Sequence, residues 1–479
     1  MMFKRHACLA ILIISIPFTL LALLSTLDNM PVETVHAVGP TLAQTTLNSS
    51  SNYTAYLPVI LRNYPPPPTV FGVQVHSLAD SSGFDQVDDL NASWVRYKAF
   101  EWDKIEATPG TYDWSSVDEA GLQRAYGRGF TIITTVQFTP QWAQKYEGSY
   151  CGPIKQEALD DFAEFLTAAV RRYKDPPYGI KYWELGNEPD MPLWYNRSGH
   201  GCWIVDDDPY SSGRYYAEML KQAYPAIKAA DPEAKVLIGG LAIVCDPDNP
   251  PPGQDCKASR LLEGILQGGG GPYFDVVSFH AYTWYGGAWG RMYNRFWTGG
   301  QIIQTTALAE RVNFLRGVLQ KYGYRDKPLL DTETALTCPE DTSDCRETQA
   351  MYAAKAYAEA IAFDLLGRTW FALINDGWYY TGLLQGADMT PKPSFYSYQK
   401  ASNFLRKARY VGPAGYPGIE GYKFQDTSNS RFIEVVWASD SNLHTISPPS
   451  GAFIYDRYGN TVSSSGSIQV GYAPLYIVY

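Results

Sequence analysis

Metal-binding histidine and cysteine motifs are missing from this chain of 479 residues. It has six histidines, of which four lie beyond residue 37, and neither an HxxxH nor a CxxC spacing occurs. Because such spacings are typical of zinc sites, we expect no catalytic metal and no cofactor. The GxSxG motif that would indicate a serine nucleophile on an α/β-hydrolase sheet is missing as well.

Clusters of lysine or arginine are also lacking. The chain has 39 Lys and Arg against 49 Asp and Glu, which gives a net charge of −10. A nucleic-acid partner would need a basic face, so we expect none. Hydrophobic residues make up 45% of the chain and charged residues 18%, enough for a sizeable core. We expect a globular protein that is a monomer.

The N-terminus has the pattern of an export signal. Lys4, Arg5 and His6 precede an apolar run from Ala7 to Leu24. This pattern predicts a signal peptide over residues 1–37, cleaved after Ala37. The run is near the lower length limit of a spanning helix, so an uncleaved anchor is the alternative, and only then would a membrane be a partner. We favour a secreted or cell-surface protein.

Residues 38–69 are rich in Ser, Thr and Pro, a composition that cannot bury a core, so we predict a disordered linker. Beyond the signal there are six cysteines, and an even number in an exported chain suggests disulfides. Closeness in sequence favours Cys245 with Cys256 and Cys338 with Cys345, among fifteen combinations. That choice leaves Cys151 with Cys202.

Short β-rich runs alternate with amphipathic helical runs from residue 70 onward. The expected strands are 70–76, 94–98, 130–138, 180–186, 235–240, 274–280, 328–333 and 369–375. Apolar faces predict helices over 159–173 and 308–322, the second ended by Gly323. Eight such units predict a (β/α)8 TIM barrel over 70–406, with a doubly wound open sheet as the alternative. Short strands separated by turns then predict a small antiparallel β-domain over 407–479.

Polar residues stand at the ends of the expected barrel strands, where a TIM barrel has its functional residues. The fourth strand leads to Asn187 and Glu188, the sixth to His280 and Tyr282, and the seventh to Glu333. On the fourth and seventh strands of one barrel, the two glutamates would face each other across the mouth. Such a pair suits acetal hydrolysis, in which one carboxyl group protonates the leaving oxygen and an ionised one attacks the anomeric carbon.

The residues around this pair fit the same chemistry. Asn187 can hydrogen-bond the 2-hydroxyl of a sugar, whereas Tyr282 and Arg96 of the second strand can donate to Glu333 and stabilise its ionised form. A separation of roughly 5–5.5 Å between the carboxyl groups gives retention of configuration, and one of roughly 6.5–9.5 Å gives inversion.

These residues resemble clan A of the glycoside hydrolases. The matching motifs follow one another in the order of that clan: Trp94-Val-Arg96, Tyr112-Asp113-Trp114, Thr139-Pro140-x-Trp142, Asn187-Glu188-Pro189, His280-x-Tyr282 and Thr332-Glu333. The resemblance covers about residues 70–400 and is nearest to family 39, which includes β-xylosidases with an appended β-domain. It implies retaining hydrolysis with Glu188 as acid/base and Glu333 as nucleophile.

The pattern departs from the clan at Gly186, where many members have tryptophan. The run from Glu184 to Glu188 also resembles the β-glucuronidase and heparanase-like family, so the sugar stays open. Asp331 competes with Glu333, and because it is two residues earlier we expect it to point the same way but deeper in the barrel. Glu184 precedes Glu188 and is expected to lie too deep for catalysis.

Substrate binding is expected of further side chains near the strand ends. Aromatic-rich stretches at 193–195 and 282–297 fit either loop packing or the stacking of sugar rings. For the histidines the alternative is a structural role. The expected binding residues are Arg96, Asn187, His280, Tyr282, Trp142, Trp378, Trp284 and His76.

Together these features predict an exported retaining glycoside hydrolase without cofactor. Its substrate would be a polysaccharide or oligosaccharide with O-glycosidic bonds of the kind that β-xylosidases and β-glucanases cleave. A carbohydrate-binding surface protein whose barrel has lost catalysis is one alternative. A transglycosylase that uses the same two glutamates is another.

Overall fold

The computed structural model describes residues 69–479, except 196–200, 295, 298–305, 376 and 387. The predicted signal peptide and nearly all of the predicted linker lie outside the described residues. Within the described part of the chain, every helix is too short or too polar to cross a membrane.

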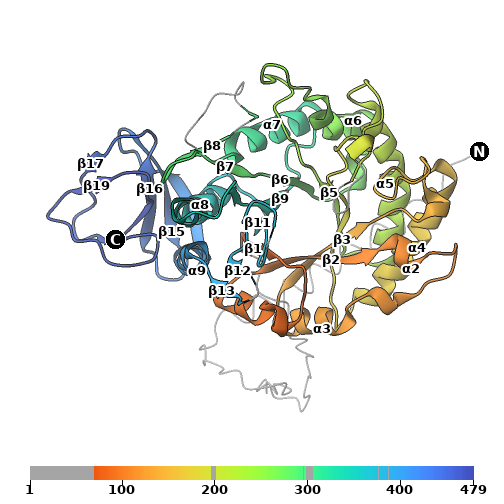
Figure 1. Ribbon diagram of the computed structural model, residues 1–479, viewed down its shortest axis with the longest axis horizontal. Helices are drawn as coiled ribbons and strands as arrows, with labels where there is room; N and C mark the ends of the chain where they lie inside the picture. Colours follow the sequence, from red (N-terminus) through yellow and green to blue (C-terminus); the bar gives the residue numbers. More distant parts are fainter. Residues whose placement is uncertain (1–68, 196–200, 295, 298–305, 376, 387) are drawn as a thin grey trace, which may run out of the picture. The chain divides into compact units, whose positions relative to one another are not determined.

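Eight parallel strands form a ring (Figure 1). In chain order they are β1 (Phe71–Gln74), β2 (Trp94–Glu101), β3 (Thr131–Gln137), β4 (Tyr182–Asn187), β5 (Lys235–Gly240), β6 (Val277–His280), β9 (Leu329–Thr334) and β11 (Gly367–Trp370). Hydrogen bonding runs in the order β5-β4-β3-β2-β1-β11-β9-β6, and the parallel bridges Leu237–Val276 and Leu241–Phe279 join β5 to β6. The predicted TIM barrel is confirmed, and the open sheet was the wrong alternative.

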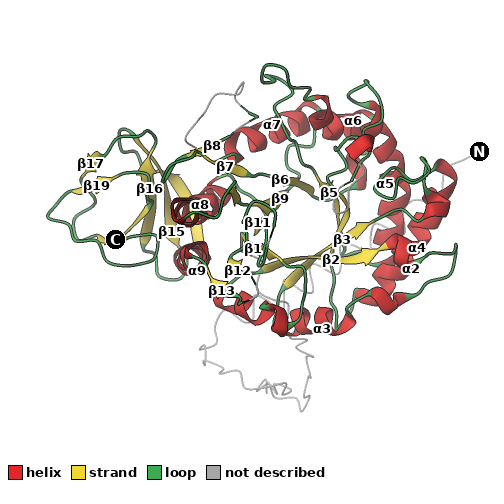
Figure 2. Cartoon of the chain, in the orientation of Figure 1, coloured by secondary structure: helices red, strands yellow, loops and turns green. Residues whose placement is uncertain are grey.

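Helices surround the ring on its outside (Figure 2). They are α2 (Trp102–Ile105), α3 (Glu119–Gly127), α4 (Leu159–Tyr173), α5 (Ser211–Ala230), α6 (Leu261–Gln267), α7 (Leu308–Lys321), α8 (Ser343–Ala362) and α9 (Pro393–Leu405). The first connection differs from the expected helix, because it has only the 3₁₀ turns η1 (Asp80–Ser82) and η2 (Phe84–Leu90). After α7 the chain passes Gly323 at φ +81°, which confirms the predicted helix end.

The inside of the barrel changes character along the strands. Near the amino ends of the strands, inward side chains form an apolar cluster of Trp94, Ile133, Leu237, Val276 and Leu330. Alternate residues of a strand share a face, so the next inward positions lie one layer nearer the mouth. There β2 has an arginine and β4 a glutamate where the lower layer has aromatic rings. The barrel is therefore sealed at the bottom and charged at the top.

A β-domain follows the barrel. Its main sheet has the antiparallel order β14 (Ala408–Pro413), β15 (Ile419–Asp426), β16 (Phe432–Ala438), β20 (Leu475–Val478) and β18 (Phe453–Tyr455), and β17 (His444–Ile446) pairs with β19 (Ile468–Val470). Helix α8 packs against β14, β15 and β16. The predicted combination of a barrel and an antiparallel domain is thus confirmed.

Three disulfides join the six cysteines of the described residues. The pairs are Cys151–Cys202, Cys245–Cys256 and Cys338–Cys345, with Cα–Cα distances of 5.3, 5.4 and 6.0 Å. This is the predicted pairing, and it fits an extracellular protein.

Candidate active site

The end of β4 turns Glu188 toward the mouth of the barrel. Gly186 has a φ of +100°, a backbone conformation that favours glycine, and Glu188 itself has a φ of +50°. The backbone N–H of Glu188 donates to the carbonyl of Gly240 on β5 at 2.8 Å, which fixes this turn. A left-handed residue that is not glycine persists only where its surroundings hold it, and such residues cluster at functional sites.

A β-bulge in β9 aims Glu333 in the same direction. On β6, Phe279 and His280 are neighbours, but their partners on β9 are Asp331 and Glu333, so β9 contains one extra residue. The same irregularity lies between β9 and β11. Bulges re-aim side chains, and this one separates Glu333 from Asp331.

The expectation that Asp331 points the same way as Glu333 was therefore wrong. Its carboxylate lies 3.0 Å from Nε of Arg368, whose guanidinium also donates to the carbonyl of Ala356 on α8. Asp331 thus lies between the strands and the helices, outside the barrel mouth, because the bulge breaks the simple alternation of the strand.

Arg96 connects the residues of the mouth. Its guanidinium donates to Glu333 at 2.5 Å, to Asn187 at 2.6 Å, to Gln74 at 2.6 Å and to Glu184 at 2.7 Å. Burial alone would lower the pKa of Arg96, but the two carboxylates raise it above its usual range. A permanently charged guanidinium therefore faces Glu333 at hydrogen-bond distance.

Two residues of the β6 end complete the cluster. The hydroxyl of Tyr282 donates to the second oxygen of Glu333 at 2.6 Å, and Nδ1 of His280 lies 2.8 Å from Glu188. Burial and the neighbouring Glu333 raise the pKa of Tyr282 far above its ordinary value of 10.0, so it remains a donor. Burial lowers the pKa of His280, but Glu333 and Glu188 outweigh it and the pKa lies above 6.5.

A glycine admits the imidazole to this position. A Cβ atom on Gly240 would lie 2.3 Å from Nε2 of His280, closer than side chains approach in proteins. The glycine at the end of β5 is therefore required by the ring that contacts Glu188.

The two carboxyl groups are close to each other and only partly enclosed. One oxygen of Glu188, one of Glu333 and Nδ1 of His280 all lie within 4.8 Å of one another. Glu188 is 8% exposed and Glu333 6%, so both are largely desolvated yet open to the mouth. These three residues could hold a cation, but both oxygens of Glu333 already accept hydrogen bonds and Arg96 adds positive charge, so the set suits a metal poorly.

The other predicted binding residues divide into two groups. Trp378 packs edge-on against Tyr282 with ring centroids 4.8 Å apart, and the exposed ring of His76 packs against Phe371 at 5.8 Å. Trp284 contacts Tyr379, with ring centroids 5.4 Å apart, and Tyr379 in turn contacts Trp378. These residues surround the mouth.

Trp142 is placed differently. Its indole N–H donates to the carbonyl of Glu106 at 2.9 Å, and its ring packs edge-on against Trp102 at 5.5 Å. Among the described contacts of Trp142, none reaches the carboxylate cluster.

Sequence reasoning missed Gln74 and Asp190, and it named Glu184 only as a residue that lies too deep for catalysis. Gln74 and Glu184 both bind the guanidinium of Arg96, and Glu184 does so although it is fully buried. The carboxylate of Asp190 accepts from the backbone N–H groups of Ala242 and Ile243 at 2.8 and 2.7 Å, which fastens the turn after Glu188 to the end of β5. Gln74 ends β1 and Asp190 follows the end of β4, so a place at or just after a strand end was the only available signal for these two, whereas Glu184 lies within β4.

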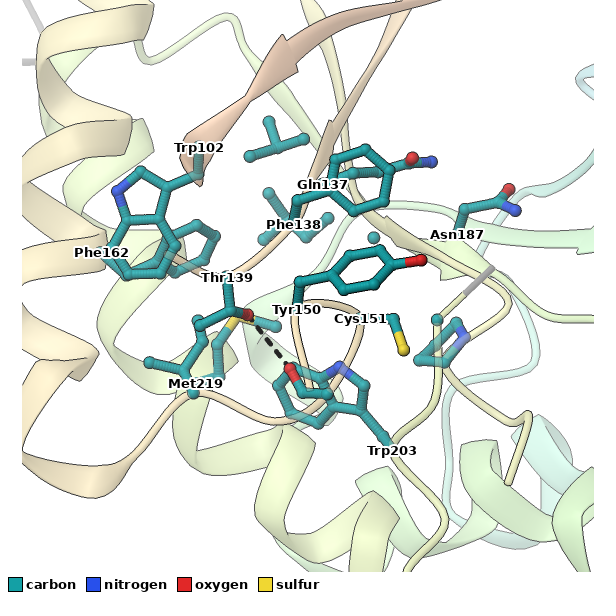
Figure 3. A pocket seen from close by; sticks show the side chains of 17 residues that line it. Trp102, Gln137, Phe138, Thr139, Tyr150, Cys151, Phe162, Asn187, Trp203 and Met219 are labelled. Atoms are coloured by element: carbon teal, nitrogen blue, oxygen red, sulfur yellow. Dashed lines mark hydrogen bonds between the residues drawn. The ribbon is translucent and has the colours of Figure 1, made fainter. Parts of the chain in front are cut away.

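A small cavity lies beside the cluster rather than within it. It has a volume of about 50 Å³, and its lining includes Phe138, Tyr150, Cys151 and Trp203. In Figure 3 the Tyr150 hydroxyl points to the side where Asn187 lies. Ligand pockets usually have volumes of roughly 300–1,000 Å³, so this cavity is too small for a sugar ring.

Comparison with solved structures agrees with this architecture. A family 39 glycoside hydrolase from the gut symbiont Bacteroides cellulosilyticus WH2 is 20% identical, with a TM-score of 0.66 over 86% of this chain and 81% of that chain. A GH30 endoxylanase from Clostridium papyrosolvens C71 is 14% identical, with a TM-score of 0.56 over 87% and 97%. A GH39 β-xylosidase from Caulobacter crescentus is 15% identical, with a TM-score of 0.53 over 87% and 98%.

No family model matches the sequence, and no curated protein does. The class that fold and site define is a (β/α)8 barrel with two facing glutamates at its mouth. More narrowly, the chain has the fold of the family 39 and family 30 glycoside hydrolases of clan A, as its motifs predicted.

Proposed function

We propose that the protein is a retaining glycoside hydrolase in which Glu188 is the acid/base and Glu333 the nucleophile. The observation that carries the proposal is the pair itself: two partly enclosed carboxyl groups with oxygens within 4.8 Å of each other. Such closeness favours retention, for which the two carboxyl groups stand roughly 5–5.5 Å apart, over inversion, for which they stand roughly 6.5–9.5 Å apart.

The first step forms a covalent intermediate. The ionised Glu333 attacks the anomeric carbon, the bond to the leaving oxygen breaks, and protonated Glu188 transfers its proton to that oxygen. Arg96 and Tyr282 orient the attacking carboxylate through one hydrogen bond to each of its oxygens. The donors also stabilise Glu333 when it becomes the leaving group of the second step.

The second step releases the sugar. Glu188, now ionised, removes a proton from a water molecule, and the resulting oxygen attacks the anomeric carbon while the bond to Glu333 breaks. Two inversions leave the configuration unchanged. His280 supports both roles of Glu188. Its imidazole holds the carboxyl group at 2.8 Å, and the ring can be charged when Glu188 is ionised and neutral when Glu188 is protonated.

Solved relatives narrow the range of substrates to test. Two of them are called a GH30 endoxylanase and a GH39 β-xylosidase, and another is an endo-β-1,6-glucanase. We infer O-glycosidic bonds in a xylan-like or glucan-like carbohydrate as the substrate class. The three disulfides favour action outside the cell, on a carbohydrate that the exported protein meets there.

The test is hydrolysis of a panel of xylo- and gluco-oligosaccharides with β-1,3, β-1,4 and β-1,6 linkages, followed by proton NMR of the first product anomer. The proposal expects cleavage of at least one member with retained configuration. An inverted product would contradict it. Binding without turnover across the panel would favour a non-catalytic carbohydrate-binding protein, and products longer than the substrate would indicate transglycosylation.

A further inference from the structure

One disulfide joins two different connections of the barrel beside the candidate acid/base. Cys151 lies in the connection between β3 and α4, and Cys202 lies in the connection between β4 and α5, 51 residues further along the chain. The other two disulfides of the described residues join cysteines that are only 11 and 7 residues apart. The long-range disulfide therefore ties the loop that follows Glu188 to the loop of the neighbouring strand β3.

A segment of the loop before α5 lies alongside the turn that carries Glu188. The backbone N–H of Gly201 donates to the carbonyl of Asn187, and that of Trp203 donates to the carbonyl of Pro189 at 3.1 Å. These two carbonyls belong to the residues on either side of Glu188. The left-handed backbone of Glu188, at a φ of +50°, is therefore flanked by hydrogen bonds from one segment.

Gly201 brings this segment as close to the turn as two backbones can come. A Cβ atom on Gly201 would lie 2.6 Å from the carbonyl oxygen of Asn187 and 2.8 Å from Cα of Pro189, closer than side chains approach in proteins. Both neighbours are backbone atoms, which cannot rotate away as the end of a long side chain can. A displacement of the segment is therefore transmitted directly to the residues around Glu188.

The disulfide fixes the other side of the segment. The backbone N–H of Cys202 donates to the carbonyl of Cys151 at 3.0 Å, so a hydrogen bond accompanies the covalent bond, and both cysteines are buried. The loop of Cys151 is itself anchored next to the end of β3, because the backbone N–H of Thr139 donates to the carbonyl of Tyr150 at 2.7 Å. The segment is thus held between a rigid loop and the turn of Glu188.

The two glutamates are held by different parts of the molecule. Glu333 is oriented by Arg96 and Tyr282, which come from β2 and from the end of β6. The turn of Glu188 is instead fastened to the end of β5 by Asp190 and to the β3 loop by the disulfide-linked segment. Loss of the disulfide should therefore displace the acid/base and leave the nucleophile in place.

We propose that the Cys151–Cys202 disulfide is a positioning element for Glu188, because it fixes the segment that packs on the turn of the acid/base. The cysteines act through the backbone around Glu188 rather than on the substrate. This inference rests on the proposed function and goes beyond it, since it makes acid catalysis dependent on an oxidised pair of cysteines. Acid catalysis then reaches its full rate only in an oxidising compartment, such as the one that an exported protein enters.

The dependence of the rate on the leaving group tests this role. Departure of dinitrophenolate needs no proton, whereas departure of phenolate needs the proton of Glu188. With these two aryl β-glycosides of the sugar that the panel identifies, Cys151→Ala/Cys202→Ala should lower kcat/KM by about 10- to 100-fold for the phenyl glycoside and by no more than about threefold for the dinitrophenyl glycoside. A general loss of stability would lower both values alike.

Two further variants separate the positioning of Glu188 from the loss of a cross-link. Cys338→Ala/Cys345→Ala removes another buried disulfide and is the matched control, which should leave the ratio of the two kcat/KM values unchanged. Gly201→Ala keeps the Cys151–Cys202 disulfide but forces the segment away from the turn, so it should lower kcat/KM more for the phenyl than for the dinitrophenyl glycoside. Thermal unfolding of each variant shows whether it is folded.

Hydrogen–deuterium exchange of residues 186–191 tests the support of the turn without turnover. The exchange should be faster in Cys151→Ala/Cys202→Ala than in the native protein and the control. Unchanged exchange, or equal falls in kcat/KM for both glycosides, overturns the positioning role and leaves the hydrolase standing. Faster exchange, while the native protein hydrolyses neither glycoside nor any member of the panel, overturns the hydrolase and leaves the disulfide as a support of the turn.

Discussion

Two buried ionic networks start from the same strand, two residues apart, and have opposite surroundings. Glu333 points into the barrel mouth, where Arg96 binds it, and it keeps 6% of its surface exposed. Asp331 points outward to Arg368, and both of these residues are completely buried between strands and helices. One bulge in β9 produces this division.

The difference shows that a shifted pKa alone does not identify an active site. Burial raises the pKa of Asp331 to about 7, and burial lowers the pKa of Lys355 on α8 to about 8, although neither residue can reach a substrate. Glu188 and Glu333 are distinguished instead by their access to the mouth and by their mutual distance. We therefore expect the outer network to act on stability and the inner one on turnover.

The largest effect on stability is expected at the outer arginine. Arg368→Met would leave Asp331 buried without its charged partner, and breaking such a pair costs about 3–5 kcal/mol. Urea unfolding should show this loss, whereas kcat of the folded variant should stay within about twofold of the native value. If Arg368→Met kept the native free energy of unfolding but lost turnover, the expected division between the two networks would be contradicted.

The inner arginine should differ from the outer one by its effect on turnover, although Arg96→Met also leaves the fully buried Glu184 without its charged partner and should lower stability too. Arg96→Met removes the donor that faces one oxygen of Glu333, and losing one such preorganised donor lowers kcat by about 10²- to 10³-fold. Arg96→Lys is the control, because it keeps the positive charge but loses the guanidinium group that reaches four partners. Its kcat should lie between those of the native protein and Arg96→Met. Unchanged kcat in Arg96→Met would contradict the role of the inner network.

The turn after Glu188 should be sensitive to pH through Asp190. Burial raises the pKa of Asp190 from 3.8 to about 6, despite two backbone donors. Because the folded state resists ionisation of this group, its contribution to stability is complete below about pH 4 and is lost as the pH rises through about 6.

Replacing that carboxyl group by an amide should remove this pH dependence. Between about pH 4 and pH 7 the native protein should lose up to roughly 3 kcal/mol of unfolding free energy relative to Asp190→Asn. Unfolding free energies of both proteins at several values in this range would show it. Parallel curves would mean that Asp190 does not titrate as its burial requires.

The smallest of these effects is expected at the β6 end. Tyr282→Phe removes one hydrogen bond to a charged oxygen of Glu333 and leaves the ring that packs on Trp378. Hydrogen bonds to charged groups contribute about 1.5–3 kcal/mol, so kcat should fall about 10- to 100-fold. The free energy of unfolding should change little, and a large drop in stability would assign Tyr282 to support of the fold.

Local patterns predicted the parts of this site that depend on one strand at a time. The alternation of β runs and helices predicted the barrel, and reading along the strands picked out Glu188, Glu333, Arg96 and Tyr282, which lie together in the structure and whose roles stay predictions. The bulge in β9 could not be predicted from the pattern of one strand, because it arises from the register of β9 against both of its neighbours, β6 and β11. The sequence therefore gave no sign that Asp331 would point away from Glu333.

Residues that act through long-range contacts were missed for the same reason. Gln74 was not singled out, and the contact of Glu184 with Arg96 was not foreseen, because the two residues reach one guanidinium from two different strands. Trp142 stood in a matching motif, but its indole is engaged by Glu106. A motif fixes the neighbours of a residue along the chain and does not fix what its side chain touches.

Azide rescue of the two glutamate variants tests the central claim most directly. With an activated aryl β-glycoside of the sugar that the panel identifies, Glu333→Ala plus azide should give the α-glycosyl azide, because azide attacks in place of the missing carboxylate. Glu188→Ala plus azide should give the β-glycosyl azide, because azide intercepts the intermediate on Glu333. Native turnover in either variant, or the same anomer from both, would contradict the assignment of nucleophile and acid/base.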